Sequence, residues 1–207
     1  MKPKKIIICI TFVVFLLSLP ICLYSQENDN KEKDSIGKQK YLYHSKGDMS
    51  FSINLGVFFP LFMLDLSDGS TSAVNTKTGG HFSAGWDIYL TPRIRVGAQV
   101  SPCFAYTPNY VYYIVPVLAR GIYEIQPIKK ISIPLYFGAG IAFTSYQDFY
   151  KVDFMLKPGF GVYYNWDIQW SFGIDVNYWW LIEFDKDRSN NRAASFLEVS
   201  ASVFYHF

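Results

Sequence analysis

Residues 168–180 read IQWSFGIDVNYWW, and this stretch decides the fold. Every second residue is large and apolar, from Ile168 through Phe172 to Trp180, and small or polar residues stand between them. Side chains of a β-strand point alternately to the two faces of a sheet, so the pattern predicts a strand with one apolar and one polar face. A helix would not gather these apolar residues on one side.

The same period of two recurs along the chain from Met49 to Phe207. Seven further segments show it, namely 49–59, 82–90, 94–101, 115–124, 131–144, 154–164 and 197–207. The polar face of these strands consists of Gly, Ser, Asn and Tyr with about one charge per strand, whereas a soluble sandwich would expose many Lys, Glu and Asp side chains. Small residues suit the narrow interior of a barrel, and the aromatic-rich apolar face suits lipid. We therefore predict an all-β fold, an eight-stranded antiparallel up-and-down transmembrane β-barrel.

The connections between the predicted strands alternate in length. Long segments at 60–80, 102–110, 145–152 and 181–194 alternate with short ones at 91–93, 126–130 and 165–167. Outer-membrane barrels have short periplasmic turns and longer extracellular loops. Both ends of the barrel domain are accordingly expected in the periplasm.

The segment before the barrel has two parts. Residues 1–25 have a lysine-rich start and then an apolar stretch, which predicts a secretory signal peptide cleaved near Ser25. An uncleaved anchor helix and lipid attachment at Cys22 are the alternatives. Residues 26–48 are dense in polar and charged residues and predict a disordered leader, so the domain boundaries are 1–25, 26–48 and 49–207.

The charge balance excludes a basic nucleic-acid-binding surface. The chain has 19 Lys and Arg against 17 Asp and Glu. Removing Lys2, Lys4 and Lys5 with the signal leaves 16 basic residues and a net charge of about −1, so no nucleic-acid partner is expected. Cys103 is then the single cysteine beyond the signal region, which excludes an internal disulfide.

These features resemble the small outer-membrane β-barrels of diderm bacteria, of the OmpX, OmpW and OmpA-transmembrane-domain type. The resemblance covers 49–207 and implies that the last strand is read by the barrel-assembly machinery. Its alternating positions are Val199, Ala201, Val203, Tyr205 and Phe207. Pro116, Pro134 and Pro158 depart from the pattern because each removes a ladder hydrogen bond, and we expect bulges there.

Seven charges are predicted to point into the barrel, three basic and four acidic: Asp87, Arg95, Arg120, Glu124, Lys157, Asp175 and Glu198. They would either line a selective conduit or pair with one another in a filled interior. The second hypothesis is favoured, because an eight-stranded barrel is just wide enough for its own side chains and an unpaired charge inside is costly.

The sequence offers little for catalysis or metal binding. We expect the three histidines to lie apart, with His44 in the leader, His81 near the outer end of its strand and His206 at the opposite end of the last strand. No cofactor or metal is predicted. A lipid-modifying enzyme would have to combine His81 with Ser70 or Ser72.

Function is expected to reside in the loops, as is common on rigid scaffolds. The leading hypothesis is an outer-membrane protein, not an enzyme, with a structural or surface-interaction role. Loops 60–80 and 181–194 are the candidate partner sites, and the second carries six charges: Glu183, Asp185, Lys186, Asp187, Arg188 and Arg192. The alternative is a small transporter for ions or hydrophobic molecules, which the OmpW resemblance implies.

Overall fold

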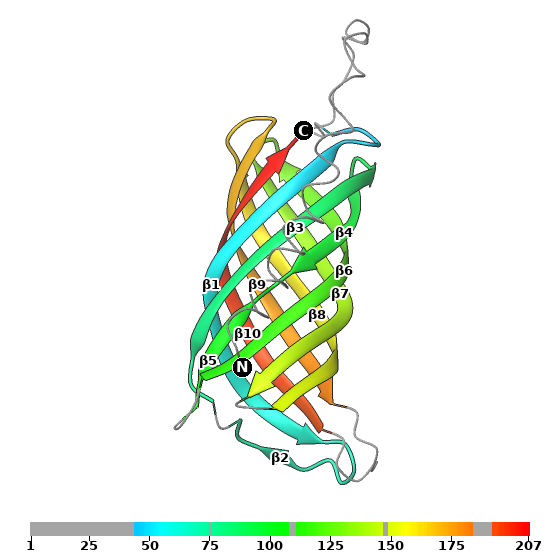
Figure 1. Ribbon diagram of the computed structural model, residues 1–207. Helices are drawn as coiled ribbons and strands as arrows, with labels where there is room; N and C mark the ends of the chain where they lie inside the picture. Colours follow the sequence, from blue (N-terminus) through cyan, green and yellow to red (C-terminus); the bar gives the residue numbers. More distant parts are fainter. Residues whose placement is uncertain (1–43, 75, 108–110, 147–148, 184–191) are drawn as a thin grey trace, which may run out of the picture. The chain divides into compact units, whose positions relative to one another are not determined.

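The computed structural model describes residues 44–74, 76–107, 111–146, 149–183 and 192–207 (Figure 1). These residues form ten strands: β1 (Met49–Asp65), β2 (Thr71–Ser72), β3 (Gly79–Thr91), β4 (Ile94–Val100), β5 (Cys103–Tyr106), β6 (Val111–Ile128), β7 (Ile131–Tyr146), β8 (Phe149–Asn165), β9 (Trp170–Glu183) and β10 (Arg192–His206). Across the five described stretches, no helix is long and apolar enough to cross a membrane.

Antiparallel pairing closes the sheet into a ring. Strand β1 pairs with β10 on one side and with β3 on the other, and each later strand pairs with its neighbour in the chain. Strands β4 and β5 are two pieces of one strand, because both pair with β3 and β6. Strand β2 lies outside the ring and pairs with the end of β1. The structure thus confirms the predicted antiparallel barrel of eight strands.

The two ends of the barrel differ (Figure 1). The connections β3–β4, β6–β7 and β8–β9 lie at the end where Met49 and Phe207 exchange two backbone hydrogen bonds of 2.8 and 2.9 Å, which we call the turn end. The strand ends between which the β1–β3, β5–β6, β7–β8 and β9–β10 connections run lie at the other end, the loop end.

The predicted long loops are shorter in the structure, since the strands continue into them. The predicted loop 145–152 is a hairpin in which β7 ends at Tyr146 and β8 begins at Phe149. Loops 60–80 and 181–194 likewise contribute to β1, β3, β9 and β10. At the turn end the β8–β9 turn is instead longer than predicted, because Ile168 lies in the turn and not in a strand. Long and short connections therefore do not alternate throughout, as they were predicted to do.

Pro116, Pro134 and Pro158 do not produce the bulges that were expected there. Pro116 pairs with Ala142 in unbroken register, and the ladders beside Pro134 and Pro158 resume in the same register after a short unpaired gap. Proline removes one donor but its backbone fits a strand, so each gap costs hydrogen bonds without shifting the strands. The described ladders instead shift register near strand ends, at Pro60/Phe62, Tyr89/Thr91 and Ile125/Ile128.

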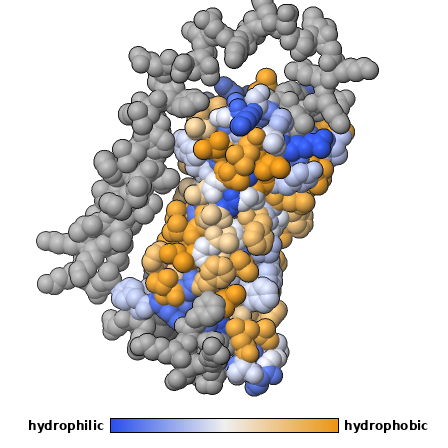
Figure 2. Space-filling view, turned by 90° about the vertical axis from the view of Figure 1, so that its right-hand side faces the viewer, coloured by the Kyte–Doolittle hydropathy of each residue, from blue (hydrophilic) through white to orange (hydrophobic). Residues whose placement is uncertain are grey.

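The outward face is apolar, as the alternation predicts. Large hydrophobic side chains of β1 and of β3 to β9 are exposed, among them Leu55 (67% exposed), Phe137 (57%) and Ile174 (59%), whereas the outward apolar side chains of β10, such as Val199 and Val203, are half-buried. Figure 2 shows hydrophobic side chains along the length of the face in view. Aromatic residues cluster near the turn end, where Tyr205 stacks on Phe207 and also packs against Trp170.

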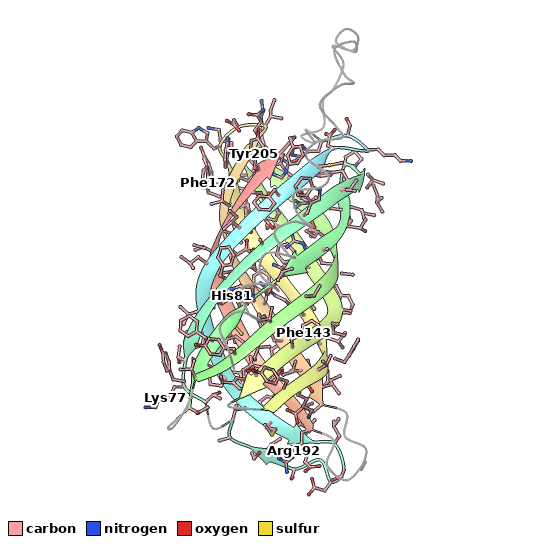
Figure 3. The ribbon with its side chains drawn as sticks, viewed as in Figure 1. Lys77, His81, Phe143, Phe172, Arg192 and Tyr205 are labelled. Carbon is pink, nitrogen blue, oxygen red and sulfur yellow. The ribbon has the colours of Figure 1, made fainter. Side chains whose placement is uncertain are left out.

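The destabilisation caused by a charge introduced on the outward face depends on how deep in the membrane the residue lies. Leu55 lies well inside β1, whereas Phe172 lies near the turn end, two residues after β9 begins (Figure 3). We expect Leu55→Arg to lower the free energy of unfolding from lipid vesicles by about 2–4 kcal/mol and Phe172→Arg by about 0–1 kcal/mol. Urea unfolding of both variants measures this. Equal losses would contradict the assignment of depth.

Candidate functional site

The barrel interior contains all seven charged side chains that the alternation assigns to it. None of them is more than 8% exposed. Alternation within each strand turns them inward, and the register of the ring then decides which of them meet. Three groups result: an inner network near the turn end, a buried acid held by hydroxyls, and a cluster around Glu198.

The inner network consists of Asp87, Arg95, Arg120 and Glu124. The Arg120 guanidinium donates to both carboxylate oxygens of Asp87, at 2.7 and 2.6 Å, and to Ser52 Oγ at 2.8 Å. A side chain at Gly85 would collide with this guanidinium. Bidentate pairs of this kind are strong and fix geometry. Arg120 is therefore locked to its acid and is not presented to a passing ion.

Arg95 is held by an acid and by two aromatic rings. Its Nη2 lies 3.3 Å from Glu124 Oε2. Its guanidinium carbon lies 5.2 Å from the centre of the Tyr89 ring and 4.7 Å from that of Phe204, within cation–π range. The side chain thus fills the interior beneath the turn end.

Asp175 is held by hydroxyl groups. Tyr136, Tyr163 and Ser202 donate to its carboxylate at 3.0, 2.7 and 2.7 Å. No ion-pair partner of Asp175 lies among the described residues. The space next to it is a cavity of about 10 Å³, lined by Arg120, Lys157 and other polar groups, which is about the room that one water needs.

The Glu198 cluster lies in the middle of the barrel interior. The Glu198 carboxylate is fully buried and accepts from Lys157 Nζ at 2.7 Å, Trp179 Nε1 at 2.6 Å and Asn177 Nδ2 at 3.0 Å. His81 Nε2 lies 3.4 Å from the same carboxylate. Lys157 also stands 4.9 Å from the centre of the Trp179 ring. Both charges of this pair are therefore satisfied inside the protein.

An apolar plug fills the interior on the loop-end side of Glu198, and the sequence analysis missed it. At its centre Phe58 packs on Phe196 (ring centres 4.5 Å apart) and on Trp179 (4.8 Å). Met63, Val74 and Tyr112 pack against it. The plug comprises Phe58, Cys103, Ala105, Ile114, Leu118, Ala142, Met155, Trp179, Leu181, Ala194 and Phe196.

The histidines confirm one expectation and correct another. His81 is the third residue of β3 and so lies near the loop-end start of its strand, as predicted, but it is only 2% exposed and lies inside the barrel (Figure 3). His44 and His206 were expected to lie apart, yet their rings stack with centres 4.4 Å apart. His44 also lies 4.7 Å from the Tyr89 ring centre, and Gly47 N donates to Tyr89 O at 2.9 Å. Residues 44–48 of the predicted leader thus cover the turn end, whereas 26–43 lie outside the described residues.

The packing of His44 on His206 and Tyr89 is expected to make the turn end sensitive to acid. The pKa of His44 is lowered to about 4, chiefly by burial and also by the nearby Arg95, while Asp48 opposes the shift. Because this pKa lies below the ordinary 6.5, the packing is complete above pH 6.5 and weakens as the pH falls towards 4.

We expect the hydrogen-exchange protection of the Gly47 amide to fall by roughly tenfold to a hundredfold between pH 7 and 4.5. Residues facing His44 are Tyr89, His206, Arg95 and Asp48. His44→Phe keeps a ring but cannot be protonated, so its protection should not change with pH. If the protection of the Gly47 amide in the wild-type protein did not change with pH, the expectation would be contradicted.

The candidate enzymatic pair does not assemble. Ser72 pairs with Met63 near the end of β1, whereas His81 pairs with Gly56, seven residues earlier in the same strand. At about 3.3 Å per residue, the positions of Ser72 and His81 along β1 are therefore roughly 23 Å apart. In the described part of the chain, no three His, Cys, Asp or Glu side chains are grouped to hold a metal ion.

The rim of the loop end carries ion pairs whose basic partners are exposed. Lys151 Nζ lies 2.9 Å from Glu183 and 3.6 Å from Asp153, and Arg192 lies 4.0 Å from Asp65. The other four charges of the predicted 181–194 loop, Asp185, Lys186, Asp187 and Arg188, lie outside the described residues.

Known proteins share this architecture. A protein-family model matches residues 27–205. An uncharacterized protein of Treponema pallidum (strain Nichols) is 28% identical over 130 residues, which is 62% of this chain and 59% of that protein. The chain spans about 60% of the length of the Treponema relatives it matches.

Two solved structures are similar in fold. Neisserial surface protein A has a TM-score of 0.56 at 12% identity, with 78% of this chain and 98% of that one covered. The outer membrane protein OprG from Pseudomonas aeruginosa has a TM-score of 0.51 at 11% identity, with 79% and 97% covered. The chain therefore belongs to the family whose model matches it, and its fold is that of the small outer-membrane β-barrel proteins.

Proposed function

We propose that this protein is a non-conducting outer-membrane barrel that serves as a rigid anchor and interacts with partners through its loop end. The apolar plug carries this proposal. Phe58, Trp179 and Phe196 meet inside the barrel at 0–1% exposure, so an ion on this path would have to lose its water among hydrocarbon side chains. The cations nearer the turn end are already paired, Arg120 with Asp87 and Lys157 with Glu198.

The loop end offers an ordered surface for a partner. The β1–β3 connection is tied down by β2, by a bond from Lys77 N to Tyr106 O of 2.6 Å, and by Val74 against the plug. Leu66 of this connection is nevertheless 45% exposed. A surface held by a rigid scaffold binds without a large ordering cost.

Planar-bilayer recording tests the proposal against its alternative, a transporter. We expect no reproducible unit conductance from the wild-type protein. A unit conductance that Arg120→Ala or Lys157→Glu abolishes would show that solutes pass through the interior. The double variant Phe58→Ala/Phe196→Ala is the positive control, because it removes two of the three aromatic rings at the centre of the plug.

We infer that the turn end faces the periplasm, because its connections are short, as periplasmic turns are. A cysteine at Ser70, on the loop end, should react with an impermeant maleimide on intact cells, whereas one at Lys129, on the turn end, should not. Native Cys103 is 4% exposed and gives a low background. The opposite labelling pattern would reverse the orientation.

The last strand is proposed to carry the assembly signal. Its alternating residues 199–207 face outward, and Phe207 packs edge-on against Trp86 at 5.4 Å. Deleting Phe207 also removes its two backbone bonds with Met49. We expect less heat-modifiable protein in outer-membrane fractions than for Phe207→Tyr. Equal amounts would count against a role of the terminal residue.

A further inference from the structure

Two turns at the turn end are joined into one surface. Asn165 N donates to Lys130 O at 2.9 Å, and Ser132 Oγ donates to Asn165 Oδ1 at 3.3 Å. The β8–β9 turn is itself rigid, because Asp167 Oδ1 accepts from the amides of Gln169 and Trp170 at 2.8 and 2.7 Å. The β6–β7 and β8–β9 turns therefore present their side chains as a unit.

This unit exposes apolar and basic groups together. Trp166 is 71% exposed, the highest value among the large hydrophobic residues described, and Ile168 and Ile128 are 59% and 54% exposed. Lys129 and Lys130 lie in the neighbouring turn and are exposed. We call Ile128, Lys129, Lys130, Trp166 and Ile168 the turn-end patch.

The patch continues the lipid-facing surface of the barrel. Tyr164, which is 44% exposed on that surface, accepts a hydrogen bond from Lys130 Nζ at 3.3 Å, and the same ammonium lies 5.7 Å from the centre of its ring. Trp170, 40% exposed, follows the turn on the adjacent strand. A positive charge thus stands where the hydrocarbon-facing rings end.

We propose that the turn-end patch binds the headgroup of an anionic phospholipid. The lysines would contact the phosphate, while Trp166, Ile168 and Ile128 lie against the upper acyl segments, the arrangement that membrane interfaces favour. Asp167 is engaged by two amides, so it does not compete with a phosphate for the lysines. The inference rests on the barrel's place in a membrane and is independent of the proposed role of the loop end.

Spin-label measurements on the folded protein in phosphatidylcholine vesicles test this. Spin-labelled phosphatidylglycerol should associate with the protein roughly fivefold to thirtyfold more strongly than spin-labelled phosphatidylcholine, the factors for about one and about two lysines near an anionic surface. Lys129→Gln/Lys130→Gln should remove the preference. Lys46→Gln/Arg93→Gln, which removes two exposed cations from the same end, should keep it.

Three results would overturn the proposal. The first is a wild-type protein that does not prefer phosphatidylglycerol to phosphatidylcholine. The second is a loss of this preference in Lys46→Gln/Arg93→Gln as large as in the lysine variant. The third is a loss of the preference in millimolar glycerol phosphate, which would assign the site to free phosphate. Heat-modifiable mobility of each variant confirms that the barrel is folded, and bilayer conductance tests the anchor proposal separately.

Discussion

Replacing Glu198 by leucine is expected to lower the free energy of unfolding by about 3–5 kcal/mol. The substitution leaves the Lys157 ammonium, whose side chain is 3% exposed, with Ser101 Oγ at 3.4 Å as its remaining hydrogen-bond acceptor. It also takes the acceptor from Trp179 Nε1, which is otherwise bonded at 2.6 Å. An uncompensated charge inside a protein is far more costly than the loss of the pair as a whole.

The double variant Lys157→Met/Glu198→Leu should therefore recover most of this loss, since it removes both charges. Asp65→Asn is the surface control, because the Asp65–Arg192 pair is 4.0 Å long and its arginine is 53% exposed, so we expect a change of at most about 1 kcal/mol. Urea unfolding from lipid vesicles, followed by tryptophan fluorescence, measures all three. A double variant as unstable as Glu198→Leu would show that the charge is not the cause.

Phe58→Ala is expected to cost about 3–5 kcal/mol, the range for removing a buried phenylalanine. Phe58 is fully buried, stacks on Phe196 and packs against Trp179, so its removal leaves a cavity that the surrounding strands cannot close. Phe58→Leu should cost less, about 1–1.5 kcal/mol.

The adjacent residue provides a matched control for the plug. Phe59 is 37% exposed on the opposite face of β1, where acyl chains move into the space that a smaller side chain leaves. Phe59→Ala should therefore lack the cavity contribution and cost clearly less than Phe58→Ala in the same unfolding experiment. Equal costs would mean that the interior at this level is not close-packed.

The plug also explains where the strand predictions ended too early. Alternation is visible only where the two faces of a strand differ. From Phe58 to Leu64 the sequence reads FFPLFML, apolar on both faces because the interior at this level is as apolar as the outside. The run Trp179–Trp180–Leu181–Ile182 has the same cause, so the residues after Phe59 and after Trp180 were assigned to loops although both strands continue.

The contacts inside the barrel required the structure. Alternation identifies Arg120 and Asp87 as inward-facing residues, but their meeting depends on the register of β3, β4 and β6, which the sequence does not display. The approach of His44 to His206 is a contact of the same kind. The polar composition of 26–48 predicts disorder. Composition does not show that His44 packs against the rings of Tyr89 and His206, which holds the last five residues of this segment at the turn end.

The hydrogen bonds between Met49 and Phe207 join the start of β1 to the residue that follows β10, so the ring closes between two strands that lie far apart in the sequence. Until β10 reaches β1, the sheet has two strands with unpaired edges, which invite pairing with other chains. The unclosed sheet therefore has to be shielded until this last pairing forms.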